Sequence, residues 1–221
     1  MRKIAQLGML AVVATSLVVA TGATSAFAES GYECRDQALG PVTIVGNLNV
    51  PAGAFCDLNG TQVTGNATVE RSPDPNNPAG LALDVGAQVG GNVQVELNGQ
   101  FVAFGGSTVG GNVQCETCQV ADLHNSSVKG NFHDNGLSQG ADIAGSSIGG
   151  NLLVQQGVDV YGFGYAFASN SIGGNFEFIG NTGASTITGN TIGGNLDCKG
   201  NTPPPVAAGN TAQKQQGQCA S

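Results

Sequence analysis

The sequence has no tryptophan and little positive charge, and the second shortage excludes two classes of partner. Among 221 residues, 7 are lysine or arginine and 15 are aspartate or glutamate. A nucleic-acid-binding surface needs a basic patch that neutralises phosphates, and a few scattered cations cannot form one. The same shortage disfavours anionic membrane surfaces. We therefore expect neither nucleic acid nor a membrane among the partners of the processed chain.

Motifs that identify common enzyme classes are also missing. The chain has no G-x-S-x-G elbow, no H-E-x-x-H zinc motif and no P-loop. No helical period of 3.6 is visible after residue 28, and 36 glycines are too many for helices of useful length. The sequence therefore predicts an all-β protein with no cofactor and no metal, and more probably not an enzyme.

The first 28 residues are typical of a secretory signal peptide. Arg2 and Lys3 precede an apolar run over 4–20, and small residues then lead to Ala-Phe-Ala at 26–28. A basic segment, an apolar segment and an A-x-A-like end predict cleavage after residue 28. An uncleaved anchor is the alternative, but polar residues interrupt the run. We expect a secreted, extracellular chain over 29–221, and without Arg2 and Lys3 the net charge of −8 becomes −10.

A repeat of about 20 residues, built on Gly-Asn, dominates the rest of the chain. Twelve Gly-Asn dipeptides occur, and eight share one frame, whose asparagines are Asn47, Asn66, Asn92, Asn112, Asn131, Asn151, Asn175 and Asn195. Valine or isoleucine stands three residues before each, and apolar residues stand one and three after each, except at Asp134. A large apolar residue such as Phe104 stands eight before most of them. This alternation predicts strands buried on one face.

Short all-β repeats of this kind predict a parallel β-solenoid, in which each repeat forms one coil stacked on the last. About eight coils at a spacing of about 4.8 Å form a rod about 38 Å long. Glycine and asparagine tolerate the positive φ of a tight corner, and stacked asparagine amides can form a ladder. Further glycines and asparagines six residues before and after the frame indicate three corners per coil. The crossover rule favours a right-handed helix.

The pattern resembles the right-handed parallel β-helix superfold. Within it, words such as Ile148-Gly149-Gly150-Asn151 are most similar to small secreted Gly-Gly-Asn repeat proteins of actinobacteria. The resemblance covers about 39–201 and implies a β-solenoid, with no particular activity. Bactofilin-like filament proteins are a second resemblance, but they are cytoplasmic and lack the Gly-Asn frame.

Six cysteines in an exported chain predict disulfides, although six allow 15 pairings and the sequence does not choose among them. Cys34 and Cys56 are one coil apart, as are Cys198 and Cys219. Each pair could join neighbouring coils at an end of the rod. We therefore expect a solenoid domain over 29–197, followed by a Pro-rich, disulfide-closed cap over 198–221.

Cys115 and Cys118 form a C-x-x-C, for which redox, zinc and structural roles are open. A redox role needs a helix start that lowers a thiol pKa, and this motif follows a predicted strand. A zinc site needs two more ligands at short spacing, and the local sequence has none. We interpret the motif as a local structural disulfide.

Two insertions lengthen the repeat and could carry function, because loops on a rigid scaffold often do. One is the Pro-rich segment 71–80, which we interpret chiefly as a tolerated insertion. The other contains Tyr161, Phe163, Tyr165 and Phe167, which an extended strand would place on one face. They predict either an aromatic platform for sugar rings or the filling of a wider core.

The remaining candidate site is a polar segment with both histidines of the chain. His124, Lys129, His133 and Asp134 lie within eleven residues. Histidine and carboxylate side chains predict an acid–base or metal site, with His124, His133 and Asp134 as the catalytic candidates. The competing interpretation is a strand that ends early at Asp134-Asn135-Gly136, with His133 pointing outward.

Three functions are consistent with these features. The first is a secreted, non-catalytic structural or surface-interaction protein, a rigid acidic rod whose partner is cell-wall or glycan material. The second is a carbohydrate-binding or carbohydrate-active β-helix that uses the aromatic and histidine segments. The third, ice binding, would use stacked Ser and Thr pairs, but adjacent hydroxyls in a strand face opposite ways. The sequence predicts no oligomeric state.

Overall fold

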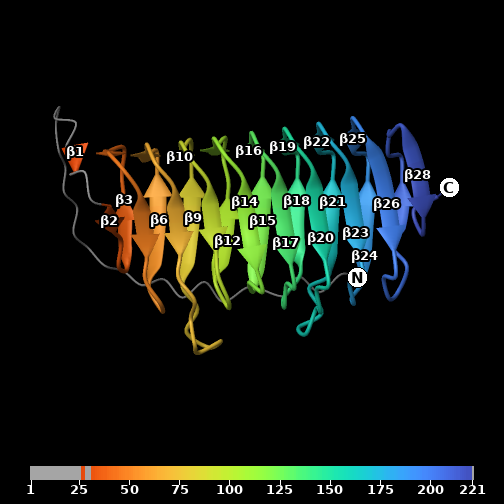
Figure 1. The fold of residues 1–221 in the computed structure, drawn as a ribbon, viewed down its shortest axis with the longest axis horizontal. Helices are drawn as coiled ribbons and strands as arrows, with labels where there is room; N and C mark the ends of the chain where they lie inside the picture. The colour runs from red at the N-terminus through yellow and green to blue at the C-terminus, as the bar shows by residue number, and fades with distance from the viewer. Residues whose placement is uncertain (1–25, 28–30, 221) are drawn as a thin grey trace, which may run out of the picture.

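The protein is a straight rod of stacked coils in the computed structural model, which describes residues 26–27 and 31–220 (Figure 1). Each coil contributes strands to three parallel sheets of nine, ten and nine strands, so the rod has about nine turns. No helix occurs in these residues, and none is therefore long and apolar enough to cross a membrane. The expected all-β, three-sided parallel solenoid is confirmed. The predicted signal peptide lies outside the described residues, apart from Ala26–Phe27.

The first sheet consists of two-residue strands, which from β4 onward bury the valine or isoleucine that stands three residues before each frame asparagine. Its strands are β1 (Ala26–Phe27), β4 (Thr43–Ile44), β7 (Gln62–Val63), β10 (Gln88–Val89), β13 (Thr108–Val109), β16 (Ser127–Val128), β19 (Ser147–Ile148), β22 (Ser171–Ile172) and β25 (Thr191–Ile192). Branched side chains suit such a half-buried pleat.

The second sheet follows the corner and buries the two apolar positions after each frame asparagine. Its strands are β2 (Tyr32–Glu33), β5 (Leu48–Val50), β8 (Ala67–Val69), β11 (Val93–Val95), β14 (Val113–Glu116), β17 (Phe132–Asn135), β20 (Leu152–Gln155), β23 (Phe176–Ile179), β26 (Asn195–Lys199) and β28 (Lys214–Gly217).

The third sheet closes the triangle before the next first-sheet strand. Its strands are β3 (Gln37–Leu39), β6 (Phe55–Asn59), β9 (Gly80–Asp84), β12 (Gln100–Ala103), β15 (Val120–His124), β18 (Ala141–Ala144), β21 (Tyr165–Ala168), β24 (Ser185–Thr188) and β27 (Val206–Ala208). The predicted core position is wrong for Phe104, which is 37% exposed, while Ala103 is buried in its place. Ala103 pairs with Leu83 and Leu123, so the corner after it shifts the column by one residue.

The Gly-Gly-Asn corner forms the expected asparagine ladder. The side-chain oxygen of each frame asparagine accepts a hydrogen bond of 2.8–2.9 Å from the backbone N–H of the next. The expected positive φ is wrong for most glycines of this corner, although it holds at the other two corners, as at Gly53 (72°) and Gly145 (61°). At Gly149 a Cβ atom would instead collide with the backbone carbonyl of Lys129 in the preceding coil. Close stacking therefore demands glycine here.

Disulfides join neighbouring coils at both ends of the rod. Cys34 is bonded to Cys56, and Cys198 is bonded to Cys219, while Cys115–Cys118 lies within one coil. The segment predicted as a cap continues the solenoid, because β27 pairs with β24 and β28 pairs with β26. The last coil is thus both hydrogen-bonded and covalently tied to the one before it.

Candidate functional site

The predicted histidine–aspartate site is not assembled. His124 ends β15 in the third sheet, whereas His133 and Asp134 belong to β17 in the second. His133 is half-buried, and the Asp134 side chain lies in the core with 0% exposure. The strand does end within 134–136, at Asn135, but it does not end early, because Asn135 pairs with the last residues of β14 and β20. The three candidates therefore lie in three different environments: the third sheet, the outer side of the second sheet and the core.

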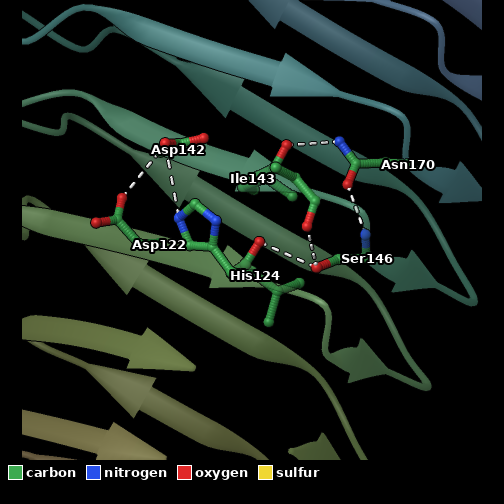
Figure 2. A network of polar contacts seen from close by, with 8 residues as sticks. Asp122, His124, Asp142, Ile143, Ser146 and Asn170 are labelled. Atoms are coloured by element: carbon green, nitrogen blue, oxygen red, sulfur yellow. Dashed lines mark hydrogen bonds and ion pairs between the residues drawn. The ribbon is translucent and has the colours of Figure 1, made fainter. Parts of the chain in front are cut away.

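His124 instead joins two aspartates on the outer face of the third sheet, in a group that we call the third-sheet cluster (Asp122, His124 and Asp142). Figure 2 shows that the three side chains converge. The backbone N–H of Asp142 donates a 2.8 Å hydrogen bond to Oδ1 of Asp122, and His124 Nε2 lies 3.6 Å from Asp142 Oδ2. The displaced Phe104 stacks on the His124 ring, with centroids 5.4 Å apart. Neighbouring coils thus supply two carboxyl groups and one imidazole.

Burial is the main influence on the acidity of Asp122 in this cluster. Burial raises the pKa of Asp122 to about 6. The N–H of Asp142 lowers that pKa, the Asp142 carboxylate raises it, and His124 lowers it. A carboxyl group with a pKa near neutrality can give or accept a proton at physiological pH. The cluster is therefore chemically capable of acid–base work.

A buried polar network holds the corner after β18, beside this cluster (Figure 2). The Ser146 hydroxyl lies 3.0 Å from the carbonyl oxygens of Leu123 and Ala144, and its backbone N–H donates to Asn170 Oδ1 at 2.9 Å. Asn170 Nδ2 donates to the carbonyl of Ile143 at 2.6 Å. These bonds fix the strand that carries Asp142.

In each pair of adjacent hydroxyl residues at this corner, the two side chains face opposite ways, as the sequence predicted. Ser107, Ser126 and Ser146 are buried, with 1%, 6% and 3% exposure. Their neighbours on the strands of the first sheet face outward in one column, which is made of Thr108, Ser127 and Ser147. Only one hydroxyl of each pair is presented at the surface, so a Thr-x-Thr face is not formed there.

The four spaced aromatic residues do not share one face. The strand β21 begins only at Tyr165, and residues 156–164 form a loop. Tyr165 and Phe167 are buried in the core, with 2% and 0% exposure, whereas Tyr161 and Phe163 are 65% and 63% exposed. The expected platform is therefore wrong for Tyr165, which fills the core, and is reduced to Tyr161 and Phe163.

Tyr161 and Phe163 are held by a single carboxylate at the tip of this loop. Asp159 accepts hydrogen bonds from the backbone N–H groups of Gly162, Phe163 and Gly164, at 2.8, 3.0 and 2.7 Å. The Tyr161 and Phe163 ring centroids are 6.2 Å apart. Three hydrogen bonds therefore hold the backbone that carries the two rings.

An apolar surface continues from this loop toward the C-terminal coil. A shallow cavity of about 290 Å³ lies beside Phe163, and its lining includes Thr186, Pro203, Pro204 and Val206. Val160 and Val206 are 67% and 64% exposed. We call Val160, Tyr161, Phe163 and Val206 the aromatic patch.

The other insertion, 71–80, is tied back to the rod. The Ser72 hydroxyl lies 3.0 and 2.6 Å from the carbonyl oxygens of Asp74 and Asn77. Gln119, which precedes β15 two coils further along the rod, donates from Nε2 to the carbonyl of Pro75 at 2.6 Å. The loop is therefore an ordered part of the surface.

One cluster escaped the sequence reasoning altogether. Sulfur atoms of Cys115 and Cys118 and a carboxylate oxygen of Asp134 lie within 4.8 Å of one another, and all three residues are buried. Burial raises the pKa of Asp134 well above its usual range, and Glu116 raises it further. The signal was present in the repeat, since Cys115 and Asp134 occupy the same column in consecutive coils.

Comparison with known proteins adds no name to these features. No family model matches the chain, and no curated protein or solved structure matches it.

Proposed function

We propose that this protein is a secreted, non-catalytic surface-interaction protein, a rigid acidic rod that contacts glycan material of a cell envelope through the aromatic patch. The observation that carries the proposal is the exposed pair Tyr161 and Phe163, which Asp159 holds at the tip of a loop. The signal-like N-terminus and the disulfides support an extracellular location. The resemblance to secreted Gly-Gly-Asn repeat proteins supports the same class.

Exposed rings of this kind suit a carbohydrate surface. The rings of Tyr161 and Phe163 are about two-thirds exposed, so they contribute little to the hydrophobic core. Contiguous apolar surface on a soluble protein commonly marks an interaction site. Aromatic faces pack against the C–H faces of sugar rings, and the fixed loop reduces the entropy that is lost on binding.

Co-sedimentation with insoluble peptidoglycan, chitin and cellulose tests this proposal. We expect the chain over 29–221 to bind at least one of them, and Tyr161→Ala/Phe163→Ala to weaken that binding about tenfold or more, because each stacked ring contributes about 1 kcal/mol. Phe55→Ala is the matched control, since Phe55 is also exposed (46%) but lies at the other end of the third sheet. Absence of binding to every polysaccharide, or equal binding by both variants, contradicts the proposal.

A second candidate function is glycoside hydrolysis at the third-sheet cluster. Its support is the neighbouring pair Asp122 and Asp142, of which Asp122 has a pKa of about 6. A raised carboxyl pKa beside a second carboxylate is the requirement for a general acid with its partner. Release of reducing sugar from envelope polysaccharides, abolished by Asp122→Asn and by Asp142→Asn but not by Asp197→Asn, would support hydrolysis. Activity that survives both cluster variants excludes this site.

A further inference from the structure

We propose that Cys115, Cys118 and Asp134 form a binding site for a thiophilic divalent cation of the zinc type, held when the two cysteines are reduced. The Cys115–Cys118 disulfide of this structure is then the oxidised, metal-free form of the site. This site lies inside the rod and is separate from the aromatic patch.

Position is the first observation. Asp134 on β17 pairs directly with Cys115 on β14, and the C-x-x-C turn returns Cys118 to the same point of the core. Other coils fill this inward column with valine, phenylalanine or the end-closing cysteine, at Val50, Val69, Val95, Val154, Phe178 and Cys198. The one carboxyl group in the column thus faces the one internal cysteine pair. Apolar packing alone gives no reason for that coincidence.

Lack of hydrogen bonds is the second observation. Asp134 is 0% exposed, and neither of its carboxylate oxygens has a hydrogen-bond partner. A disulfide carries no S–H that could donate to them. A buried polar group without a partner is strongly unfavourable. A cation between the carboxylate and two thiolates would satisfy all three groups at once.

The donor set fits such a cation. Thiolates bind zinc at about 2.3 Å and carboxylates at about 2.0–2.2 Å, so ligand atoms on one ion lie about 3–4 Å apart. The three donor atoms already lie within 4.8 Å of one another. All three donor residues are completely buried, so an ion held between them would be shielded from solvent.

Loading of the site needs a reductant and releases protons. An external dithiol transfers two electrons and two protons to the Cys115–Cys118 disulfide, which becomes two thiols, while the dithiol becomes a disulfide. The cation then displaces both thiol protons to water, with any proton on the Asp134 carboxyl group. Loss of the cation followed by oxidation restores the disulfide.

Metal titration of the reduced full chain tests the site. The protein is reduced without denaturant, freed of reductant under anaerobic conditions and titrated with Co²⁺, whose tetrahedral thiolate complexes absorb strongly in the visible range. We expect one Co²⁺ per chain, displaced by Zn²⁺. Cys115→Ser/Cys118→Ser should abolish uptake, and Asp134→Val should weaken it more than about tenfold, the effect that even an outer-shell partner produces. Cys34→Ser/Cys56→Ser is the matched control and should bind as the wild type does.

Three results would contradict the proposed metal site. A reduced chain that retains its β-sheet circular dichroism but takes up no Co²⁺ overturns the proposal. So does uptake that is unchanged in Cys115→Ser/Cys118→Ser or in Asp134→Val. If reduction unfolds the chain, refolding with Zn²⁺ replaces the titration. Zn²⁺ must then restore the β-sheet signal in the wild type and not in Cys115→Ser/Cys118→Ser, and equal recovery of both also overturns the proposal.

Discussion

The side-chain oxygen of Asn131 accepts a 2.8 Å hydrogen bond from the backbone N–H of Asn151 in the next coil. The same relation joins the other frame asparagines in sequence order. Each side chain therefore sets the position of the following coil, and the glycines before it allow the two backbones to come close. The repeated Gly-Asn word is explained by stacking, so it does not mark a ligand site.

A second, largely buried ladder joins Asn170, Asn190 and Asn210. Its bonds should contribute more to stability than those of the exposed ladder of frame asparagines. Asn131→Ala should lower the free energy of unfolding by about 1 kcal/mol, because both hydrogen bonds of its side chain, from the Asn151 N–H and to Asn112 Oδ1, are exposed. Asn190→Ala should cost about 2–3 kcal/mol, because buried Asn190 bonds to Phe167, Asn170 and Asn210. Urea unfolding measures both, and a larger loss for Asn131→Ala contradicts this ranking.

Removal of the buried carboxyl group should stabilise the oxidised protein. Asp134→Val should raise the free energy of unfolding by about 1–3 kcal/mol, because it removes an unsatisfied group and restores the valine found at Val95 and Val154. Glu177→Val, at an outward position of the same sheet, should change it by less than about 0.5 kcal/mol. A destabilised Asp134→Val, measured in metal-free buffer, is the contrary outcome.

Asp122 should make stability depend on pH. Burial raises its pKa to about 6 in the fold, above the usual value of about 3.9. A raised carboxyl pKa contributes stability that is full below about pH 4 and is lost as pH rises through about 6. Asp122→Asn removes this loss, so the variant should gain stability relative to the wild type between pH 4 and 7. Urea unfolding at pH 4, 5.5 and 7 measures the gain; a difference that stays constant disagrees with the pKa.

Truncation to alanine should strongly lower stability in the buried half of the aromatic segment and hardly change it in the exposed half. Phe167→Ala should cost about 3–5 kcal/mol, because Phe167 packs edge-on against Phe176 and Phe178, with centroids 5.0 and 5.5 Å apart. Tyr161→Ala/Phe163→Ala should change stability by less than about 0.5 kcal/mol. Thermal unfolding separates the two, and a strong loss in the exposed pair would place these rings in the core.

Loss of the C-terminal disulfide should act locally. Cys198→Ala/Cys219→Ala opens a link of 21 residues, and links of this size stabilise by about 3 kcal/mol. Because β28 contacts its own sheet only through β26, its amides should exchange hydrogen much faster, while β14 and β17 remain protected. Uniformly faster exchange along the rod would show that the coils unfold together.

Most of the fold was predictable, because every coil of a solenoid repeats the same pattern of buried positions and corners. The columns around the frame asparagine give the parallel register directly: for example, Val113 pairs with Phe132, and Phe132 pairs with Leu152. The error at Phe104 arose because one extra corner residue moves a column without changing the repeat length visibly. The positive φ expected at the Gly-Gly corner was a different error, since contact between coils, and not backbone conformation, requires glycine there.

The candidate sites were less predictable, because they depend on which side chains of neighbouring coils lie next to each other. Asp122 and Asp142 stand nine residues before consecutive frame asparagines, so the alignment contained the pair, but neither breaks an apolar column. His133 and Asp134 are adjacent in sequence and point to opposite faces of β17. The aromatic segment keeps a period of two only from Tyr165 onward, because Gly162 and Gly164 adopt φ of 77° and 80° and break the strand.

The two covalent links at the ends determine how the rod would respond to tension. The coils stack along the long axis of the rod (Figure 1), so a pull along that axis loads the hydrogen bonds between the strands of neighbouring coils. The gap between the first two coils is bridged by Cys34–Cys56 and the last gap by Cys198–Cys219. Each disulfide limits how far the two coils of an end gap can separate, so we expect the interior gaps to open first under tension.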